Sequence, residues 1–303
     1  MSVAFLFPGQ GVDAVAACHD WVRHSAGVRG LMEVTASAVG LSADELLDGG
    51  GRHFSRTEVV QPVLAALCLG IHQELRSVGI RPGFVAGHSF GEIPASAAAG
   101  FFADDAAVGL AALRGRLMAR EASKRPGGML ALVGIQRETV EAALTIGRAF
   151  GEVHLAAWNA PNEWVVTGEP EALRRIAAQY RSVPLAVAGA WHGPQMAPAV
   201  EELRRALQEA AQSRPAASFV CNRSGLPVDD PEDIPDLLAE QLVRPVLWAK
   251  TLETLADAGV ADFVTVGPGK VLRAQVRRTL GSRARVLGTE SPEDFSQTVE
   301  ALG

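Results

Sequence analysis

Two stretches of this sequence share one arrangement, an apolar run that meets a glycine-containing turn. VAFLF at 3–7 ends in PGQG, and FVAG at 84–87 leads through HSFG into an alanine-rich helical pattern. Helical spacing of apolar residues also covers 57–79, 104–121, 246–259 and 270–281, and 260–269 reads as another strand that reaches a glycine turn. Buried strands that alternate with helices are typical of a parallel sheet. The sequence therefore predicts an α/β fold built on a parallel sheet.

The middle of the chain predicts a second, smaller unit. Five segments follow one another in the order strand, helix, hairpin, helix, strand: MLALVGI, RETVEAALTIGRAF, EVHLAAWNAPNEWVVTG, PEALRRIAAQYR and SVPLAVAGAWH. This is the order of a split βαβ, ferredoxin-like unit. We expect a small ferredoxin-like subdomain at 124–190, inserted into a discontinuous large subdomain formed by 1–123 and 191–303, with a cleft between the two.

The composition argues against several classes of protein. With 303 residues, of which 48% are hydrophobic, the chain can bury a large core, and its net charge of −6 disfavours nucleic acid and membrane surfaces as partners. The three cysteines lie far apart, which argues against a disulfide framework or a zinc site. The N-terminus reads as a strand rather than a signal peptide, and no apolar run is long enough to span a bilayer. We expect a cytoplasmic protein with no metal and no bound cofactor.

The pentapeptide GHSFG at 87–91 has the pattern of a nucleophile elbow. In this turn a serine lies between a strand and a helix, and glycines flank it because a side chain there would clash. The hydroxyl of Ser89 would then lie near the positive end of the helix, where backbone N–H groups can hold a developing oxyanion. The alternative is a serine in a purely structural turn. The strand before and the helix after favour the nucleophile.

A nucleophilic serine needs a base, and two histidines, His154 and His192, follow Ser89 in the chain. His154 lies within an apolar strand, which indicates a packed side chain. His192 lies in AGAWHGPQM, after a predicted strand and before a glycine and proline turn, which suits a side chain at a cleft. We predict His192 as the base. In an ordinary α/β-hydrolase the histidine comes late in the chain, and nothing after His192 is a histidine, so a common esterase is disfavoured.

Seven motifs together resemble one family. In order along the chain they are FPGQG, GHSFGE, RGRLM, NAPNEWVVTG, WHGPQM, EQLVRPVLW and VGPGKVL. Their order and spacing, over nearly the whole chain, are similar to those of the malonyl-CoA:acyl carrier protein transacylase family, which includes polyketide synthase acyltransferase domains. The resemblance implies an α/β-hydrolase-like core with an inserted ferredoxin-like subdomain. It also implies transfer of an acyl group from CoA, through an acyl-serine, to the phosphopantetheine thiol of an acyl carrier protein in fatty acid or polyketide biosynthesis.

The resemblance assigns roles to matching residues. Ser89 would be the acylated nucleophile, with His192 as general base and later general acid. In this family a main-chain carbonyl orients the histidine, and the matching position is Gln241. The oxyanion hole would be formed by the backbone N–H groups of Gln10 and Phe90. The CoA thioester enters as a substrate, so the reaction implies no cofactor.

Arg114 matches the arginine that holds the free carboxylate of malonyl or methylmalonyl groups in this family. A planar fork of N–H donors fits a carboxylate with two hydrogen bonds. The alternative is a solvated arginine on a helix. Three further residues, Gln61, Met118 and Asn159, match positions near the acyl pocket, although Met118 would be equally suited to core packing.

The tetrad that ends at the histidine departs from the family pattern. Malonyl-selecting polyketide domains tend to have His-Ala-Phe-His there and methylmalonyl-selecting ones Tyr-Ala-Ser-His, whereas this chain has Gly189, an alanine, Trp191 and the histidine. An indole beside the acyl α-carbon would exclude an α-methyl group, unless the glycine lets it swing aside and open a longer pocket. Phe90, next to the serine, would either narrow the pocket or pack on Trp191.

The activity best supported by the sequence is therefore transfer of a malonyl group. Two alternatives stay open: transfer of an unusual acyl group from one carrier protein to another, and hydrolysis of an acyl thioester. A catalytically idle docking subunit is disfavoured by the intact Ser89, His192 and Arg114.

Overall fold

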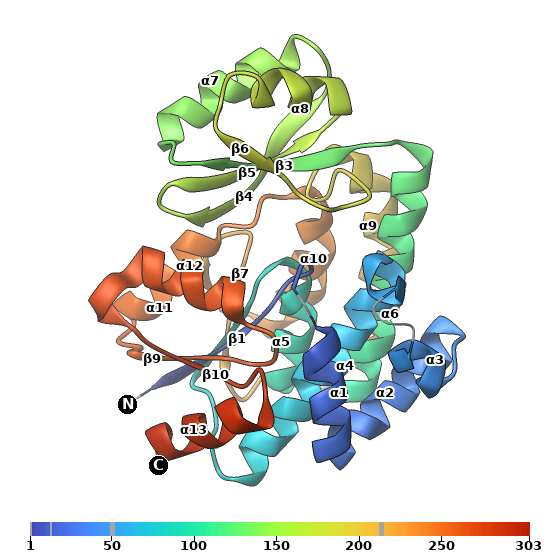
Figure 1. The fold of residues 1–303 in the computed structure, drawn as a ribbon, viewed down its shortest axis with the longest axis vertical. Helices are drawn as coiled ribbons and strands as arrows, with labels where there is room; N and C mark the ends of the chain where they lie inside the picture. The colour runs from blue at the N-terminus through green and yellow to red at the C-terminus, as the bar shows by residue number, and fades with distance from the viewer. Residues whose placement is uncertain (1, 13, 49–51, 212–214) are drawn as a thin grey trace.

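The computed structural model of the protein describes residues 2–12, 14–48, 52–211 and 215–303 (Figure 1). Its large sheet has the strand order β10-β9-β1-β2-β7-β8. The first five strands are parallel, and β8 is antiparallel to β7. The strands are β1 (Val3–Phe7), β2 (Phe84–Gly87), β7 (Ser218–Cys221), β8 (Leu226–Pro227), β9 (Asp262–Thr265) and β10 (Arg285–Gly288). The predicted parallel α/β sheet is confirmed.

Helices cover both faces of the large sheet (Figure 1). The chain crosses the sheet in one direction from β1 to β2 and in the other from β9 to β10. Because connections between parallel strands are right-handed as a rule, the helices between β1 and β2 are expected on one face and α12, which joins β9 to β10, on the other. The helices that flank this sheet are α1 (Val15–His24), α2 (Ala26–Val39), α3 (Ala43–Asp48), α4 (Thr57–Ser77), α5 (Glu92–Ala98), α6 (Asp104–Lys124), α9 (Ala197–Ala210), α10 (Ile234–Glu240), α11 (Trp248–Asp257), α12 (Lys270–Leu280) and α13 (Pro292–Leu302). Among these, α4, α6, α11 and α12 are the helices that the apolar spacing predicts.

A second sheet lies above the first in Figure 1 and has the antiparallel order β4-β5-β3-β6. It consists of β3 (Gly128–Val133), β4 (Val153–Ala160), β5 (Glu163–Gly168) and β6 (Ser182–Pro184), with α7 (Arg137–Arg148) and α8 (Pro170–Ala177) packed on it. This is the predicted ferredoxin-like order. The sheet and its two helices bury a hydrophobic core of their own, distinct from that of the large sheet. The separate core supports the division at 124–190, whose boundaries stay a prediction.

The last strand of the small sheet is shorter than the sequence predicts. A strand is expected up to the histidine, but β6 ends at Pro184, and the chain then turns, with the N–H of Val187 bonded to the carbonyl of Leu185. Proline removes a ladder donor, and the glycine and alanine residues that follow have low strand propensity. The segment that carries His192 is therefore a loop and a turn.

His72 is a buried histidine that none of the described residues satisfies by hydrogen bonding. It lies on α4 with its ring edge-on to Phe5 of β1, at a centroid distance of 6.0 Å. Burial lowers its pKa to about 4, and the charges of Arg76 and Arg81 act in the same direction. In the unfolded chain this histidine binds a proton below pH ~6.5, whereas in the folded protein it stays neutral until the pH falls to its lowered pKa.

We expect the folded state to lose stability through this histidine as the pH falls. Between pH ~7.5 and ~5 the free energy of unfolding should fall by about 2 kcal/mol more in the wild type than in the variant His72→Leu. Urea denaturation of both proteins at the two pH values measures the difference. An equal fall in the free energy of unfolding in both proteins would show that folding does not lower the pKa of His72.

Candidate active site

Ser89 lies at a sharp turn between β2 and α5, as the elbow pattern predicts. Its φ is 52°, in the left-handed region that L residues rarely adopt. A Cβ atom at Gly87 would fall 1.9 Å from the carbonyl carbon of Gly91, and one at Gly91 would fall 2.3 Å from the carbonyl oxygen of Phe7. The two glycines are therefore required by the close approach of backbone to backbone.

His192 is hydrogen-bonded to the serine. Its Nε2 lies 2.7 Å from Oγ of Ser89, and its Nδ1 lies 2.8 Å from the main-chain carbonyl oxygen of Gln241. A carbonyl oxygen only accepts, so Nδ1 carries the proton and Nε2 is free to accept that of the serine. The other candidate, His154, lies half-buried on β4 and takes no part in this pair. Of the two histidines after Ser89, His192 is the one that the structure brings to it.

The backbone at His192 is strained like that at Ser89. Its φ is 59°, and among the described residues these two are the only ones other than glycine with positive φ. Such conformations cost about 1–3 kcal/mol each and are found mostly at functional sites. The strain in both members of the pair indicates that the fold holds them in place against local preference.

His192 is neutral in this environment. Burial and, after it, the positive charge of Arg114 lower its pKa to about 3, while the hydrogen bond to the carbonyl of Gln241 acts in the opposite direction. No carboxylate side chain hydrogen-bonds to the ring among the described residues. The histidine is thus poised to accept a proton, and its charged form is stabilised only weakly.

Arg114 lies on α6 and is 1% exposed. Its Nη1 donates to Oε1 of Gln61 at 2.9 Å and lies 3.0 Å from Sδ of Met118, and its Nη2 donates to Oε1 of Gln241 at 2.8 Å. Gln241 therefore contacts both His192, through its carbonyl, and Arg114, through its side chain. A guanidinium carries five N–H donors, more than these contacts use. The solvated-arginine alternative is wrong, and Arg114 belongs to the same site as the Ser–His pair.

The loop after β1 reaches this site. Oε1 of Gln10 accepts hydrogen bonds from Oγ1 of Thr57 at 2.8 Å and from Nε2 of Gln61 at 2.6 Å. A Cβ atom at Gly9 would fall 2.9 Å from the carbonyl oxygen of His88, so the loop packs directly on the elbow. Phe90 is buried in the turn after the serine. The oxyanion role of the Gln10 and Phe90 N–H groups stays a prediction.

The small sheet contributes Asn159. Its Oδ1 lies 2.8 Å from Nε2 of His88, which precedes the nucleophile, and its Nδ2 donates to Oε1 of Glu163 at 3.2 Å. Glu163 in turn forms an ion pair of 2.6 Å with Arg278 on α12. Asn159 thus lies where the small sheet meets the elbow, and its place near the acyl pocket stays a prediction.

Trp191 packs against the glycine two residues before it. A Cβ atom at Gly189 would fall 2.6–2.7 Å from Cζ3 and Cη2 of the indole and 2.8 Å from Cβ of Ala122. The indole therefore occupies the room that a side chain at 189 would fill. Phe90 and Trp191 both join the main core, but they do not form a ring pair among the aromatic contacts of the described residues.

The structure adds two residues that the sequence does not single out, Asn222 and Glu92. Oδ1 of Asn222 accepts the backbone N–H of Ser89 at 2.7 Å, and its Nδ2 donates to the carbonyl of Gly87 at 2.6 Å. Asn222 directly follows β7, at the same carboxyl edge of the sheet as the serine. The only feature of the sequence that could have indicated Asn222 is its place as a polar residue directly after the short apolar run SFVC. Glu92, in contrast, stands within the GHSFGE motif.

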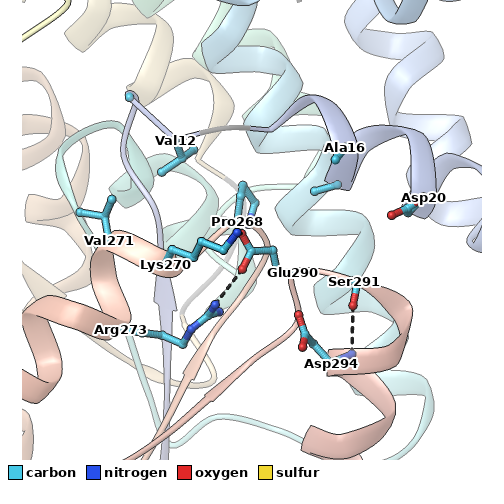
Figure 2. Close-up of a pocket in the computed structure, with 12 residues that line it drawn as sticks. Val12, Ala16, Asp20, Pro268, Lys270, Val271, Arg273, Glu290, Ser291 and Asp294 are labelled. Carbon is cyan, nitrogen blue, oxygen red and sulfur yellow. Dashed lines mark hydrogen bonds and ion pairs between the residues drawn. The ribbon is translucent and has the colours of Figure 1, made fainter.

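A separate cavity of about 510 Å³ lies at the carboxyl ends of β1, β9 and β10 (Figure 2). It is lined by Val12 and Asp20 on one side and by Lys270 and Arg273 of α12 on the other, and Arg273 is paired with Glu290 at 2.7 Å. Neither Ser89 nor His192 lines this cavity. It is therefore not the acyl pocket.

Comparison with known proteins decides the family. The sequence model described as acyl transferase domain matches residues 4–302. The chain belongs to the acyl transferase family. The malonyl CoA-acyl carrier protein transacylase of Bacillus subtilis is 28% identical to it, over 99% of this chain and 97% of that protein. The transacylase of Mycobacterium bovis is 34% identical, over 97% of this chain and 98% of that protein.

Solved structures of the acyl transferase family have the same fold. A malonyl-CoA:acyl carrier protein transacylase from Xanthomonas oryzae has a TM-score of 0.92 and 28% identity, covering 99% of both chains. A malonyl-transacylase solved with a type II polyketide synthase acyl-carrier protein has a TM-score of 0.92 and 27% identity, covering 99% of this chain and 100% of that one. The two-subdomain architecture predicted from the sequence is therefore that of an acyltransferase.

Three further features of the described part of this acyltransferase concern metals, membranes and cysteines. The described part of the chain has no group of three or more His, Cys, Asp or Glu side chains arranged to hold a metal ion. Within that same part, every helix is too short or too polar to cross a membrane. Its three cysteines are buried and free.

Proposed function

We propose that this protein transfers a malonyl group from CoA, through an ester on Ser89, to the phosphopantetheine thiol of an acyl carrier protein. The observation that carries the proposal is the buried Arg114, which Gln241 connects to the Ser–His pair. A buried guanidinium beside a nucleophile favours an acyl group that ends in a carboxylate. The names of the relatives, malonyl CoA-acyl carrier protein transacylases, supply the donor and the acceptor.

In the first half-reaction, the hydroxyl of Ser89 gives its proton to Nε2 of His192 while Oγ attacks the thioester carbonyl. The tetrahedral intermediate collapses with cleavage of the C–S bond, and His192 returns the proton to the sulfur of CoA. The N–H groups of Gln10 and Phe90 donate to the oxyanion. In the second half-reaction, the carrier thiol gives its proton to His192, its sulfur attacks the ester, and Ser89 departs as the restored hydroxyl.

Arg114 also acts on the base. Its charge disfavours the imidazolium form of His192, and a substrate carboxylate bound to the guanidinium would compensate that charge. The proton then moves from Ser89 to His192 more readily once a carboxylate is bound. Recognition of the acyl group therefore favours the acylation step as well as binding.

Intact-mass spectrometry tests this function. After brief incubation with malonyl-CoA we expect a malonyl adduct on the wild type and none on Ser89→Ala, and the adduct should move to a holo carrier protein when that protein is added. Parallel incubations with methylmalonyl- and acetyl-CoA report whether Trp191 excludes an α-methyl group and whether Arg114 requires a carboxylate.

Two results would replace the proposal with an alternative. If no CoA ester labels Ser89, the donor is an acyl group on a carrier protein, and its pocket is to be sought at Phe90, Gly189 and Trp191. If the adduct forms but disappears in water as fast as with carrier protein, the protein is a thioester hydrolase.

The proposal extends to cofactor and location. The steps above use protein side chains, backbone donors and the CoA thioester, so the reaction requires no bound cofactor. We place the protein in the cytoplasm, where its free, buried cysteines stay reduced and its CoA donor is made available.

A further inference from the structure

Glu92 is a carboxylate in the main core, with no exposed surface. It opens α5, three residues after the nucleophile. Its Oε1 accepts the backbone N–H of Asn222 at 2.5 Å, and its Oε2 accepts from Nε2 of Gln241. Burial raises its pKa to about 8, against the hydrogen bonds from Asn222 and Gln241 and the charge of Arg114, which lower it. A buried carboxylate is costly unless it is paired, and Asn222, Gln241 and Arg114, which all contact the site, offset part of this cost.

Both partners of Glu92 hold the backbone of the nucleophile. The side chain of Asn222 accepts the N–H of Ser89 at 2.7 Å, and Nε2 of Gln241 donates to the carbonyl of Ser89 at 2.7 Å. The peptide groups on either side of the strained Cα are thus held by the side chains of two residues, and both of these residues also bond Glu92, Asn222 through its backbone N–H and Gln241 through its side chain. Those side chains come from segments 133 and 152 residues away along the chain.

Glu92 also decides which way the amide of Gln241 points. Both oxygens of Glu92 accept here, from the N–H of Asn222 and from Nε2 of Gln241, and an arginine only donates, so Nε2 faces Glu92 and Oε1 faces Arg114. With the amide so fixed, Nε2 is the atom that reaches the carbonyl of Ser89. The same residue gives its main-chain carbonyl to His192. One carboxylate therefore orders the contacts to Ser89, His192 and Arg114.

We propose that Glu92 is a positioning residue for acyl transfer, which holds the strained turn of Ser89 through Asn222 and the amide of Gln241. The inference rests on the proposed function only in taking Ser89 as the nucleophile. It assigns Glu92 no contact with the substrate. Its effect is on how well Oγ of Ser89 is aimed, and a displacement of about 1 Å at a reacting atom can cost about 10²-fold in rate.

The variant Glu92→Gln tests this role, because it keeps the shape and reverses one contact. The new NH₂ group would face either Nε2 of Gln241 or the backbone N–H of Asn222, donor against donor, so one of the two residues that hold Ser89 loses its partner. The probe is a small neutral fluorophosphonate, which labels a nucleophilic serine and carries neither CoA nor a carboxylate. We expect the second-order rate constant for labelling Ser89 to fall about 10- to 100-fold, measured by intact mass on folded protein.

Glu121→Gln is the matched control. Glu121 is also a buried carboxylate, on α6, but its partners are Arg120 and Lys124 at the surface. We expect this variant to react at the wild-type rate. Where Glu92→Gln does not fold, Glu92→Asp replaces it: the shorter side chain keeps the charge but cannot reach Asn222 and Gln241 together, so labelling slows there too.

Two results would overturn the inference. One is a wild-type rate constant for labelling in folded Glu92→Gln, or in Glu92→Asp where that variant replaces it, whether or not the melting temperature is lower. The other is an equal loss of rate in Glu121→Gln. If the wild type reacts with the fluorophosphonate but takes no acyl group from malonyl-CoA, the proposed function is wrong. The role of Glu92 is then still decided by the labelling rates of its variants.

Discussion

Replacement of His192 by alanine is expected to lower the rate of acyl-serine formation by about 10²–10⁴-fold, the usual contribution of a general base. The hydroxyl of Ser89 would lose the acceptor that lies 2.7 Å away, and water would have to take its proton. The contact that we propose between Arg114 and the substrate carboxylate does not involve His192, so the KM for malonyl-CoA should change little. Rapid-quench intact-mass measurements give the acylation rate directly.

A second histidine provides the control for this prediction. His154→Ala removes the other histidine that follows the serine, which lies on β4 outside the Ser–His pair. It should acylate at the wild-type rate. An acylation rate in His192→Ala within several-fold of wild type would mean that another group takes the proton of Ser89, and the proposed mechanism would be wrong.

The fold follows from the sequence where structure is local. β1 and β2 are short apolar runs that meet glycine turns, and α4, α6, α11 and α12 show helical spacing, so each was predictable from its own residues. β6 was not, because its length depends on pairing with β3 across the small sheet. Pro184 and the alanine and glycine residues after it end the strand, where apolar character alone would extend it.

The site was predictable in part. The turn of Ser89 is predicted by five adjacent residues, GHSFG. His192 is predicted because only one other histidine follows Ser89 in the chain. The hydrogen bonds of Asn222 and Gln241 to the backbone of Ser89 were not predictable, since each joins segments more than a hundred residues apart. The contacts on both ring nitrogens of His192 were not predictable either, because they come from Ser89 and Gln241, which lie far away along the chain.

The variant Arg114→Met is expected to change which acyl group the protein accepts. The acylation rate with malonyl-CoA should fall about 10²–10³-fold, since a buried charge-assisted pair with two hydrogen bonds contributes about 3–4 kcal/mol. The rate with acetyl-CoA should stay within several-fold, because acetyl has no carboxylate to lose. Methionine keeps the length of the side chain against Gln61 and Met118, which limits the effect on folding.

Arg116→Met is the control for that variant, because Arg116 lies two residues further along α6 and faces solvent. It should leave both rates unchanged. If Arg114→Met slows malonyl and acetyl transfer equally, the arginine only positions Gln241 and Gln61, and another group binds the carboxylate of the substrate. If malonyl transfer alone is lost, Arg114 binds the carboxylate of the acyl group. The charge of Arg114 disfavours the protonated form of His192 in the empty site, and the bound carboxylate compensates that charge. Selection of the acyl group and activation of Ser89 then both depend on Arg114.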